Sequence, residues 1–437
     1  MAIKILATGD LHIGKKAAAA ISGGSGYSSG ENWLRIVKWS IGNSVNAVML
    51  SGDIIDRDNR FFEAVGPLHN GFELLRDANI PVFLVCGNHD YDVLPQIVNT
   101  GKFPNVHILG GEGEWEVKKY IFPDGTVQFI GWSFPAQFVS GDPFDNFSIT
   151  SLISPELPSI GLLHTQIDAA SSPYAPVSTS RLTSSVVNTW VLGHIHKPCD
   201  LDGDLKKYYY PGSPLSLSSK EPGEHGPLLF EIENNTIKKP ERVLLSPLRF
   251  EQLSVDVTGA DSHLILRERI INTLKIKGES ILKSHPELKN IIVDLIIEGE
   301  HNSPDTVQKW CSGIEESLAL NIGYSLQLNV RSIDFLLHIP MDQLIQLSGQ
   351  NTPLGVLANI ISLIEQGNEN ETINSMVKEW ISDYNTILSS ATFSPLSNDI
   401  NTSDMRGNEL EEFAKRAILK ESYRLLGTLR NQKSVNL

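Results

Sequence analysis

The sequence predicts an α/β protein with more than one domain. Its length of 437 residues favours two or three domains. Short apolar runs recur through the first half of the chain, and stretches with helical spacing separate the first three of them. Hydrophobic residues make up 41% and charged residues 20% of the chain, which is typical of a globular protein and excludes a disordered one. We therefore expect sheets layered with helices, with functional loops at the strand ends.

The larger predicted domain covers residues 1–247. Brief apolar runs predict buried strands at residues 3–8, 47–50, 82–85, 160–163 and 190–192. Helical spacing predicts helices at residues 33–41 and 61–78, and later runs predict antiparallel strands at 208–210, 228–233 and 236–239. The stretch 17–30 is rich in Ala, Gly and Ser and reads as a surface loop, either a tolerated insertion or a substrate contact.

The second half of the chain predicts a smaller α/β domain followed by helices. Residues 248–340 read as a βαβαβ unit, with strands at 253–257, 290–298 and 325–332 and helices at 260–276 and 303–320. The remaining segments are a helical extension at 341–388, with helices at 352–364 and 372–388, a linker at 389–403 and an amphipathic helix within 404–437. A single amphipathic helix is unstable alone in water, so this last helix is expected to dock on another surface.

Charge and cysteine content limit the possible functions and compartments of the protein. The formal net charge of −15 argues against binding nucleic acid through a general positive potential. It does not argue against nucleic acid that is bound through metal ions or beside a more basic partner. Three scattered cysteines exclude a disulfide framework and indicate a reducing compartment. The chain shows no signal peptide and no apolar stretch long enough to span a bilayer, which predicts a soluble, cytoplasmic protein without a membrane partner.

Five short segments place metal-binding side chains directly after predicted strands. They are Gly9-Asp10-Leu11-His12, Gly52-Asp53-Ile54-Ile55-Asp56, Gly87-Asn88-His89-Asp90, Leu163-His164 and Gly193-His194-Ile195-His196. Each segment alone is a weak signal, because Gly-Asp pairs are common turns and single histidines are more often structural. Together, at the strand ends where an α/β sheet gathers its site, they predict one metal centre.

The ligand types limit the choice of metal. Carboxylates, one amide oxygen and four imidazoles without a thiolate suit Mn²⁺, Fe or Zn²⁺. Seven ligands exceed the needs of one ion, so the economical interpretation is two ions that share a carboxylate. Two ions about 3.5–4 Å apart can bridge a hydroxide and clamp a phosphate for in-line displacement.

In this order the segments resemble the motifs of the calcineurin-like metallophosphoesterases. The chain is further similar to the SbcD-type nuclease subunits of DNA double-strand-break repair, and the resemblance covers about residues 1–340. The residues that carry it are Tyr210-Pro211-Gly212-Ser213-Pro214-Leu215, Leu217-Ser218, Glu221 and Gly226-Pro227-Leu228. The resemblance implies a two-sheet αββα sandwich, a small α/β capping domain and a C-terminal helical segment that binds a partner.

The resemblance also implies a role for each motif residue. One ion would take Asp10, His12, Asp53 and His196, and the other would take Asp53, Asn88, His164 and His194. Asp53 would be the bridging ligand. His89 would be the catalytic residue that faces the scissile phosphodiester and protonates the leaving oxygen or stabilises its charge. Asp90 would either orient His89 or cap a turn.

The function implied by the resemblance is that of a Mn²⁺-dependent DNA nuclease subunit. It would act as an exonuclease on duplex ends and as an endonuclease on single strands or hairpins. It would form a homodimer bound to a coiled-coil, SMC-like ATPase of the SbcC type, which would provide most of the DNA affinity. The terminal helix, residues 404–432, would be the docking element.

Two alternatives stay open. Asp56-Arg57 is similar to the Asp-Arg pair of serine/threonine phosphatases, although Asp58 and Asn59 follow where those enzymes have Gly. A phosphoprotein phosphatase or another metallophosphoesterase is therefore the second candidate. The SbcD-type relatives of bacteria share Asp at position 56, whereas archaeal and eukaryotic counterparts carry a histidine there. A non-catalytic DNA-end scaffold is the third candidate, and the loss of a ligand would favour it.

Overall fold

The computed structural model describes residues 2–17, 27–58, 63–314, 318–368, 370–389 and 407–435. Most of the predicted surface loop and of the predicted linker, residues 18–26 and 390–403, therefore lie outside the described residues. The chain divides into two compact units. The first contains residues 1–251, 277–293 and 319–329, and the second contains residues 252–276, 294–318 and 330–437.

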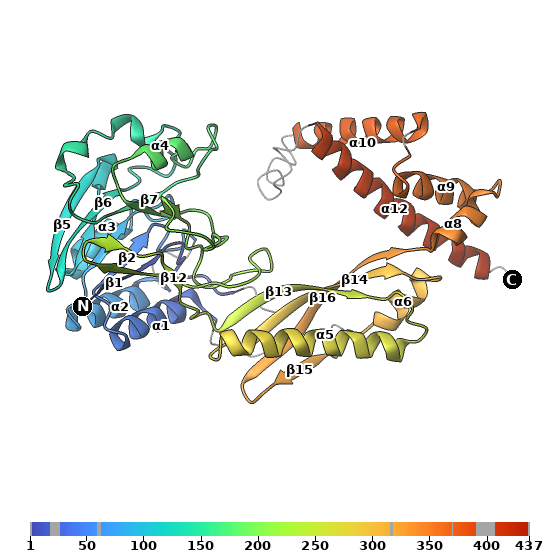
Figure 1. The fold of residues 1–437 in the computed structure, drawn as a ribbon, viewed down its shortest axis with the longest axis horizontal. Helices are drawn as coiled ribbons and strands as arrows, with labels where there is room; N and C mark the ends of the chain where they lie inside the picture. The colour runs from blue at the N-terminus through green and yellow to red at the C-terminus, as the bar shows by residue number, and fades with distance from the viewer. Residues whose placement is uncertain are drawn as a thin grey trace. The chain divides into compact units, whose positions relative to one another are not determined.

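A seven-stranded mixed sheet forms one layer of the first unit (Figure 1). Its strands are β1 (Ile3–Thr8), β2 (Ala47–Ser51), β3 (Val82–Val85), β4 (Val106–Ile108), β10 (Leu228–Glu233), β11 (Thr236–Ile237) and β12 (Glu241–Arg242). The order is β11-β10-β1-β2-β3-β4, and β12 also pairs with β10. Strands β1 to β4 run parallel, whereas β10 is antiparallel to β1.

A five-stranded sheet forms the second layer. Its strands are β5 (Glu116–Phe122), β6 (Gly125–Trp132), β7 (Ser159–His164), β8 (Thr189–Gly193) and β9 (Tyr208–Tyr209), in that order across the sheet. Strands β6 to β9 are parallel, and β5 joins β6 in an antiparallel hairpin that the sequence analysis missed. Most side chains of β5 are polar or partly exposed, so this strand lacks the continuous apolar run that marks the buried strands.

The two sheets pack face to face around one apolar core. Phe83 of β3 stacks on Phe129 of β6 with 3.8 Å between ring centroids, and Met49 and Leu162 are fully buried in the same cluster. Helices α1 (Ser29–Gly42), α2 (Val65–Asp77) and α3 (Leu94–Gly101) cover the outer face of the first sheet. Helix α4 (Thr179–Ser184) and the 3₁₀ turns Pro143–Asn146 and Ile149–Leu152 cover the second sheet. This layering confirms the predicted α/β class.

A four-stranded sheet follows in the chain. It has the order β13-β14-β16-β15, with β13 (Leu248–Asp256), β14 (Asn290–Glu300), β15 (Ala319–Ile322) and β16 (Leu326–His338), and its helices are α5 (His263–Ser284) and α6 (Pro304–Cys311). The predicted helix 303–320 is wrong in its second half, because α6 ends at Cys311 and residues 319–322 form β15. Gly313, at a φ of 77°, adopts the left-handed conformation that ends helices. The predicted βαβαβ unit therefore contains an additional hairpin.

In the part of the second unit that the structure describes, four helices follow the sheet. They are α8 (Met341–Ser348), α9 (Pro353–Glu365), α10 (Glu371–Ser389) and α12 (Asn408–Val435). Ala414 and Ile418 of α12 are buried in a cluster with Ile373 of α10, and Leu426 is fully buried in a cluster with Ala358 of α9. These residues of the apolar stripe of α12 thus pack on helices of the same chain. The docking of α12 on a separate ATPase stays a prediction. Among the described residues, no helix combines the length and the apolar character needed to cross a membrane.

Candidate metal centre

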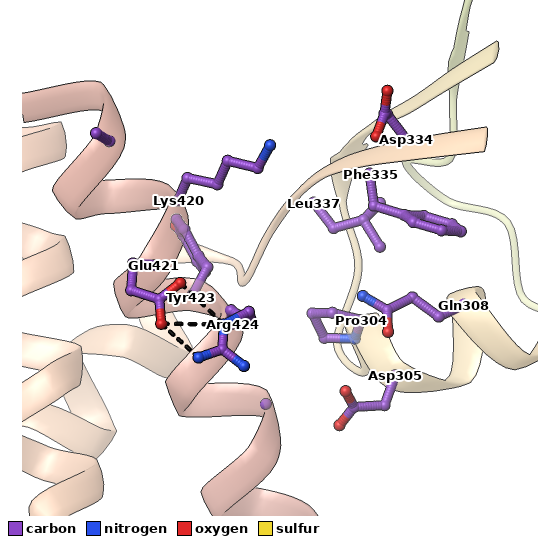
Figure 2. Close-up of a pocket in the computed structure, with 12 residues that line it drawn as sticks. Pro304, Asp305, Gln308, Asp334, Phe335, Leu337, Lys420, Glu421, Tyr423 and Arg424 are labelled. Carbon is purple, nitrogen blue, oxygen red and sulfur yellow. Dashed lines mark hydrogen bonds and ion pairs between the residues drawn. The ribbon is translucent and has the colours of Figure 1, made fainter. Parts of the chain in front are cut away.

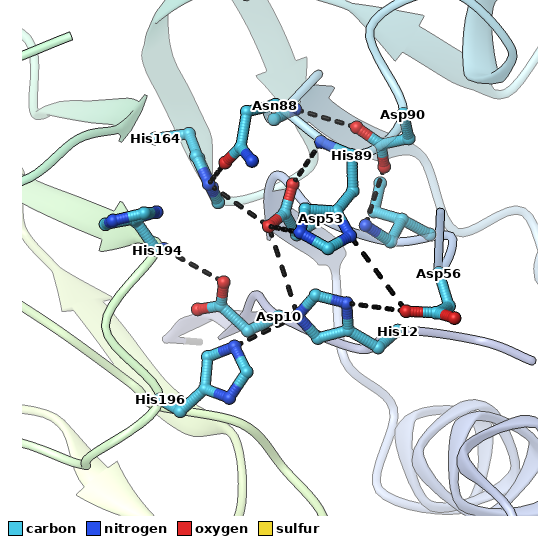
Figure 3. Close-up of polar contacts among 12 residues, drawn as sticks. Asp10, His12, Asp53, Asp56, Asn88, His89, Asp90, His164, His194 and His196 are labelled. Carbon is cyan, nitrogen blue, oxygen red and sulfur yellow. Dashed lines mark hydrogen bonds and ion pairs between the residues drawn. The ribbon is translucent and has the colours of Figure 1, made fainter. Parts of the chain in front are cut away.

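The structure brings together all seven predicted metal-binding residues and His89 (Figure 3). The motif segments leave the carboxyl ends of β1, β2 and β3 in one sheet and of β7 and β8 in the other. Because the two sheets pack face to face, these ends meet at one edge of the sandwich. Backbone hydrogen bonds tie the first two segments together, since the N–H groups of Asp10 and His12 donate to the carbonyls of Gly52 and Asp53, each at 3.0 Å.

One group of donor atoms consists of Asp10, His12 and His196, whose ligand atoms lie within 4.8 Å of one another. The Nε2 atoms of His12 and His196 face each other at 3.0 Å. Two donors bound side by side to one ion, each at about 2.1 Å, lie about 3 Å apart. The spacing of these two rings therefore suits a shared metal ion.

A second group consists of Asp10, Asp53 and His164, again within 4.8 Å of one another. His164 Nε2 lies 3.1 Å from Asn88 Oδ1 and 3.4 Å from Asp53 Oδ2. The same Asp53 oxygen is 3.9 Å from His12 Nε2. Asp10 belongs to both groups, and Asp53 Oδ2 approaches His12 of the first group from its place in the second. The assignment of Asp53 as the bridging carboxylate stays a prediction.

His194 occupies a different position from the other candidate ligands. Its backbone N–H donates to Asp10 Oδ1 at 2.9 Å, and its ring lies edge-on to His164 with 5.4 Å between centroids. Among the described residues, the groups of mutually close donor atoms do not include the His194 ring. The assignment of this ring as a ligand stays a prediction.

The backbone is strained at several of these residues. Asp10, His12, Asp53 and His194 have φ values of 49°, 43°, 48° and 92°, in the left-handed region that residues with a side chain rarely adopt. Such strain persists where the surrounding structure holds it, and it concentrates at functional sites. Gly52 precedes Asp53 at a φ of 93°, and a Cβ there would lie 2.6 Å from His164 Nδ1. Only glycine fits at this close approach of β2 to β7.

Hydrogen bonds fix the orientation of two candidate ligand rings. His164 Nδ1 lies 3.0 Å from the carbonyl oxygen of Ser51, and His196 Nδ1 lies 2.8 Å from Glu221 Oε1. Burial would lower the pKa of both rings, but Asp53 and Glu221 outweigh it and raise the pKa of His164 to about 9 and that of His196 above its usual range. With Nδ1 donating to its acceptor, metal binding would displace the proton from each Nε2, which faces the donor groups. Glu221 is a functional candidate to which the sequence analysis gave no role. No local pattern links it to His196, because the two residues are 25 positions apart in irregular loops.

Burial and charge shift the pKa values of the site. Burial alone would raise the pKa of Asp53, but His164 and His12 outweigh burial and hold that pKa well below its usual range. Burial lowers the pKa of His194 to about 3 and that of His89 to about 4. The Asp53 carboxylate is therefore ionised and these two rings are neutral at neutral pH, which are the protonation states that metal binding and hydrogen bonding to substrate need.

His89, with 27% of its side chain exposed, forms a third group of close donor atoms with His12 and Asp56. Its Nε2 is 3.9 Å from Asp53 Oδ2, and its Nδ1 is 3.9 Å from Asp56 Oδ1. Asp56 also lies 3.6 Å from His12 Nδ1 and 3.0 Å from Lys15 Nζ, so it belongs to the site, as its place in the second motif segment predicts, although the sequence analysis did not include it among the ligands. Asp90 caps turns, because its carboxylate accepts hydrogen bonds from the backbone N–H groups of Gly87 and Ile54 at 2.7 and 2.6 Å.

The donor set fits divalent metal ions. Asp10 Oδ2 is buried without a hydrogen-bond partner in the structure, although a carboxylate oxygen in such a place needs a proton donor or a cation. Carboxylates, imidazoles and one amide oxygen, with no thiolate among them, match Mn²⁺, Fe or Zn²⁺. These side chains can therefore bind metal ions, and they leave the identity of the metal open.

A cleft of about 450 Å³ lies within the second unit (Figure 2). It is lined by Pro304 of α6, Leu337 of β16 and Tyr423 of α12, with Lys420 and an ion pair between Glu421 and Arg424 on the α12 side. In the described parts of the chain, the groups of close metal-binding side chains all lie in the first unit and none lies here. The candidate catalytic chemistry therefore belongs to the first unit.

Comparison with known proteins supports this reading of the first unit. Residues 3–198 match the model of the calcineurin-like phosphoesterase family, so this part of the chain is a calcineurin-like metallophosphoesterase domain. Proteins of this family use a dimetal centre. The chain is 30% identical over 246 residues to YhaO, an uncharacterised metallophosphoesterase of Bacillus subtilis; the match covers 54% of this chain and 58% of the relative, less than two thirds of that protein's length.

Solved structures give weaker similarities. The protein TT1561 of Thermus thermophilus is 12% identical with a TM-score of 0.35, and the match covers 55% of this chain and 99% of that one. A putative 5'-nucleotidase of Staphylococcus aureus is 13% identical with a TM-score of 0.36, covering 63% and 59%. Similarities this low do not define a substrate.

Proposed function

We propose that this chain hydrolyses phosphodiesters and acts as the nuclease subunit of an SbcD-type complex that processes DNA ends. The observation that carries the proposal is the packing of the subfamily segment, residues 210–228, against the candidate metal centre. Within this segment Glu221 accepts a hydrogen bond from His196, and the N–H of Ser213 donates to the His196 carbonyl at 3.0 Å. The residues on which the resemblance to the SbcD-type nucleases rests thus contact a candidate metal ligand directly.

The site has the parts that phosphodiester hydrolysis needs. Bound divalent ions, Mn²⁺ in our proposal, would supply a hydroxide nucleophile at neutral pH and neutralise charge on the phosphate. Asp53 would provide a ligand to both ions, and Glu221 would fix the tautomer of His196. His89 is accessible from solvent and is neutral at neutral pH, so its N–H can donate a hydrogen bond to the leaving oxygen as charge develops there.

A phosphomonoesterase, such as a phosphoprotein phosphatase, is the second candidate function. It is favoured by the Asp56-Arg57 pair, because Asp56 lies within 4 Å of His12, His89 and Lys15. Arg57 directly follows Asp56, and a guanidinium there would donate the paired hydrogen bonds that a terminal phosphate accepts. The two candidates differ in the charge and size of the phosphate ester that they accept.

The partner proposal is revised by the packing of α12. We propose that an SMC-like ATPase binds the outer surface of the helices α8, α9, α10 and α12 and that two copies of the chain act together. The support is that Ile345 of α8 and Val356 of α9 are 56% and 58% exposed although α12 already covers the inner face. Val356→Asp is expected to abolish co-purification with the ATPase while nuclease activity of the subunit alone persists. Retained co-purification would place the contact elsewhere.

A direct assay tests the proposed activity. The purified chain with Mn²⁺ is incubated with end-labelled duplex, hairpin and single-stranded DNA, with and without the ATPase, and in parallel with phosphopeptides and p-nitrophenyl phosphate. Cleavage of DNA that Asp53→Asn abolishes would support the nuclease. Turnover of the monoesters without any DNA cleavage would instead support the phosphatase, and no turnover of either class would support the scaffold.

A further inference from the structure

Two aromatic side chains, Tyr174 and Phe138, extend the row of packed rings that begins at His194 in the candidate centre. Tyr174 packs against His194 with 4.6 Å between ring centroids and an angle of 37° between planes. Phe138 follows at 6.0 Å from the Tyr174 ring, tilted by 47°. The three rings therefore form a contiguous row in the first unit, which begins at a candidate metal ligand.

The backbone holds these two aromatic residues in fixed positions. Val139, next to Phe138, bridges to Tyr174: its N–H donates to the Pro173 carbonyl at 2.8 Å, and its carbonyl accepts from Ala175 at 2.6 Å. Ala175 is fully buried and has a φ of 48°, in the left-handed region. Thr165, directly after His164, donates its hydroxyl to the Ala175 carbonyl at 2.6 Å. The segment that carries Tyr174 is thus anchored beside a candidate ligand, and it carries backbone strain.

The outer ring is exposed despite this anchoring. Phe138 keeps 56% of its surface accessible, while its neighbour Phe134 is buried at 2% and packs against His164 with 5.6 Å between centroids. An aromatic ring that is held in place near a candidate metal ligand and left open to solvent can receive a second flat ring. Every nucleobase has such a face, so stacking tolerates any sequence.

Resting on the function proposed above, we propose that Phe138 and Tyr174 form a stacking platform for the base of a nucleotide adjacent to the scissile phosphodiester. The row of rings begins at His194, so a stacked base lies close to the donor groups that would hold the reacting phosphate. The chain carries a net charge of −15 and offers nucleic acid little general electrostatic attraction. A stacking contact supplies affinity that does not depend on charge, and it favours a frayed or single-stranded end, whose bases are free to stack.

The first experiment compares the ring with its removal. Phe138→Leu keeps an apolar side chain without a ring, Phe138→Trp restores a ring, and Leu152→Ala changes a side chain that is equally exposed, at 56%, on a 3₁₀ turn. With single-stranded oligonucleotides and Mn²⁺, Phe138→Leu should lower kcat/KM about tenfold, within the range of one base–aromatic contact. Phe138→Trp should restore it, and Leu152→Ala should leave it unchanged.

The second experiment removes the base instead of the ring. An abasic site at the nucleotide next to the cleaved bond should lower kcat/KM of the wild-type protein about tenfold. The same abasic site should hardly lower kcat/KM of Phe138→Leu any further, because the substitution and the missing base delete the same contact. If the abasic site lowers kcat/KM of Phe138→Leu by the same factor as it does for the wild type, the two contacts are independent and the proposal is overturned. A change in oligomeric state on Phe138→Leu would also overturn it, since the ring would then belong to an interface between copies.

A binding measurement separates this proposal from the proposed activity. Single-stranded DNA with 2-aminopurine at its terminal position is titrated with the full chain and Mg²⁺. Fluorescence quenching by the wild type and by Phe138→Trp, but not by Phe138→Leu, would support the platform even if no DNA is cleaved. Equal quenching by all variants would overturn the platform, whether or not the chain proves to be a nuclease.

Discussion

Replacing Glu221 by glutamine should weaken metal binding at one of the two donor groups. Glu221 Oε1 lies 2.8 Å from His196 Nδ1, and Oε2 accepts hydrogen bonds from the Leu217 N–H at 2.9 Å and the Ser213 hydroxyl at 3.1 Å. Burial alone would raise the pKa of Glu221, but the hydrogen bond from His196 lowers it, so the group is a carboxylate at neutral pH. The substitution keeps the shape of the side chain and removes its charge.

The magnitude follows from the bond that changes. A hydrogen bond to a charged group contributes about 1.5–3 kcal/mol and a neutral one about 0.5–1.5 kcal/mol. The exchange therefore costs about 1–1.5 kcal/mol, or about tenfold in affinity, which is within the range found for residues that orient metal ligands. Only the ion held by His196 should be affected, so one ion should bind normally and the other about tenfold more weakly.

Calorimetric titration of the metal-free protein with Mn²⁺ measures both affinities, and the Mn²⁺ concentration for half-maximal activity gives a second readout. Glu224→Gln is the matched control, because Glu224 is half exposed and pairs with Arg249 at 3.3 Å, away from the donor groups. Wild-type affinities at both sites in Glu221→Gln would refute the inferred role of Glu221. An equal loss at both sites would instead indicate that the substitution disturbs the whole loop.

Three further predictions concern single residues. Asp53→Asn should reduce bound metal to less than one ion per chain by elemental analysis and abolish hydrolysis, because Asp53 Oδ2 lies within 4 Å of His12 in one donor group and of His164 in the other; two retained ions with full activity would contradict the predicted bridging role. His89→Gln should keep metal content and DNA binding while single-turnover cleavage slows about 10²–10⁴-fold, whereas a loss of metal would make His89 a ligand. The hydrogen bond to Glu365 raises the pKa of His338 above its usual range, so its stabilising effect is complete below about pH 6.5 and is lost as the pH rises through the raised pKa. Thermal unfolding from pH 6 to 9 should therefore show a larger loss of stability for the wild type than for His338→Gln, and parallel curves would refute this linkage.

Local patterns were enough to predict the buried strands that carry the site residues. The strands β1, β2, β3, β7 and β8 are continuous apolar runs, because both of their faces are buried between sheets and helices. The convergence of the motif residues followed from their place after such strands. The same reasoning failed at β5, which is an edge strand with a partly exposed face, and at β15, which lies beyond the left-handed Gly313.

Contacts between distant loops could not be read from the sequence. The roles of Glu221 and Asp56 depend on which loops meet at the carboxyl edge of the sheets, and no periodicity encodes that meeting. The same holds for α12, whose amphipathic pattern correctly predicts that its apolar face is buried. The pattern does not say what covers that face, and the structure shows that α9 and α10 of the same chain do so.

The pairing of β1 with β10 has a consequence for how this protein is made. Strand β1 is hydrogen bonded on one side to β2, but its other edge is completed by residues 228–232, from Ile3 opposite Ile232 to Ala7 opposite Leu228. A ribosome that adds about 5–20 residues per second needs roughly ten seconds or more to synthesise the intervening stretch. Until then the nascent chain holds Asp10 at the end of a half-paired strand with an open edge, which is the kind of surface that invites association with other chains. A fragment that stops at residue 198, where the family match ends, would keep that edge open permanently.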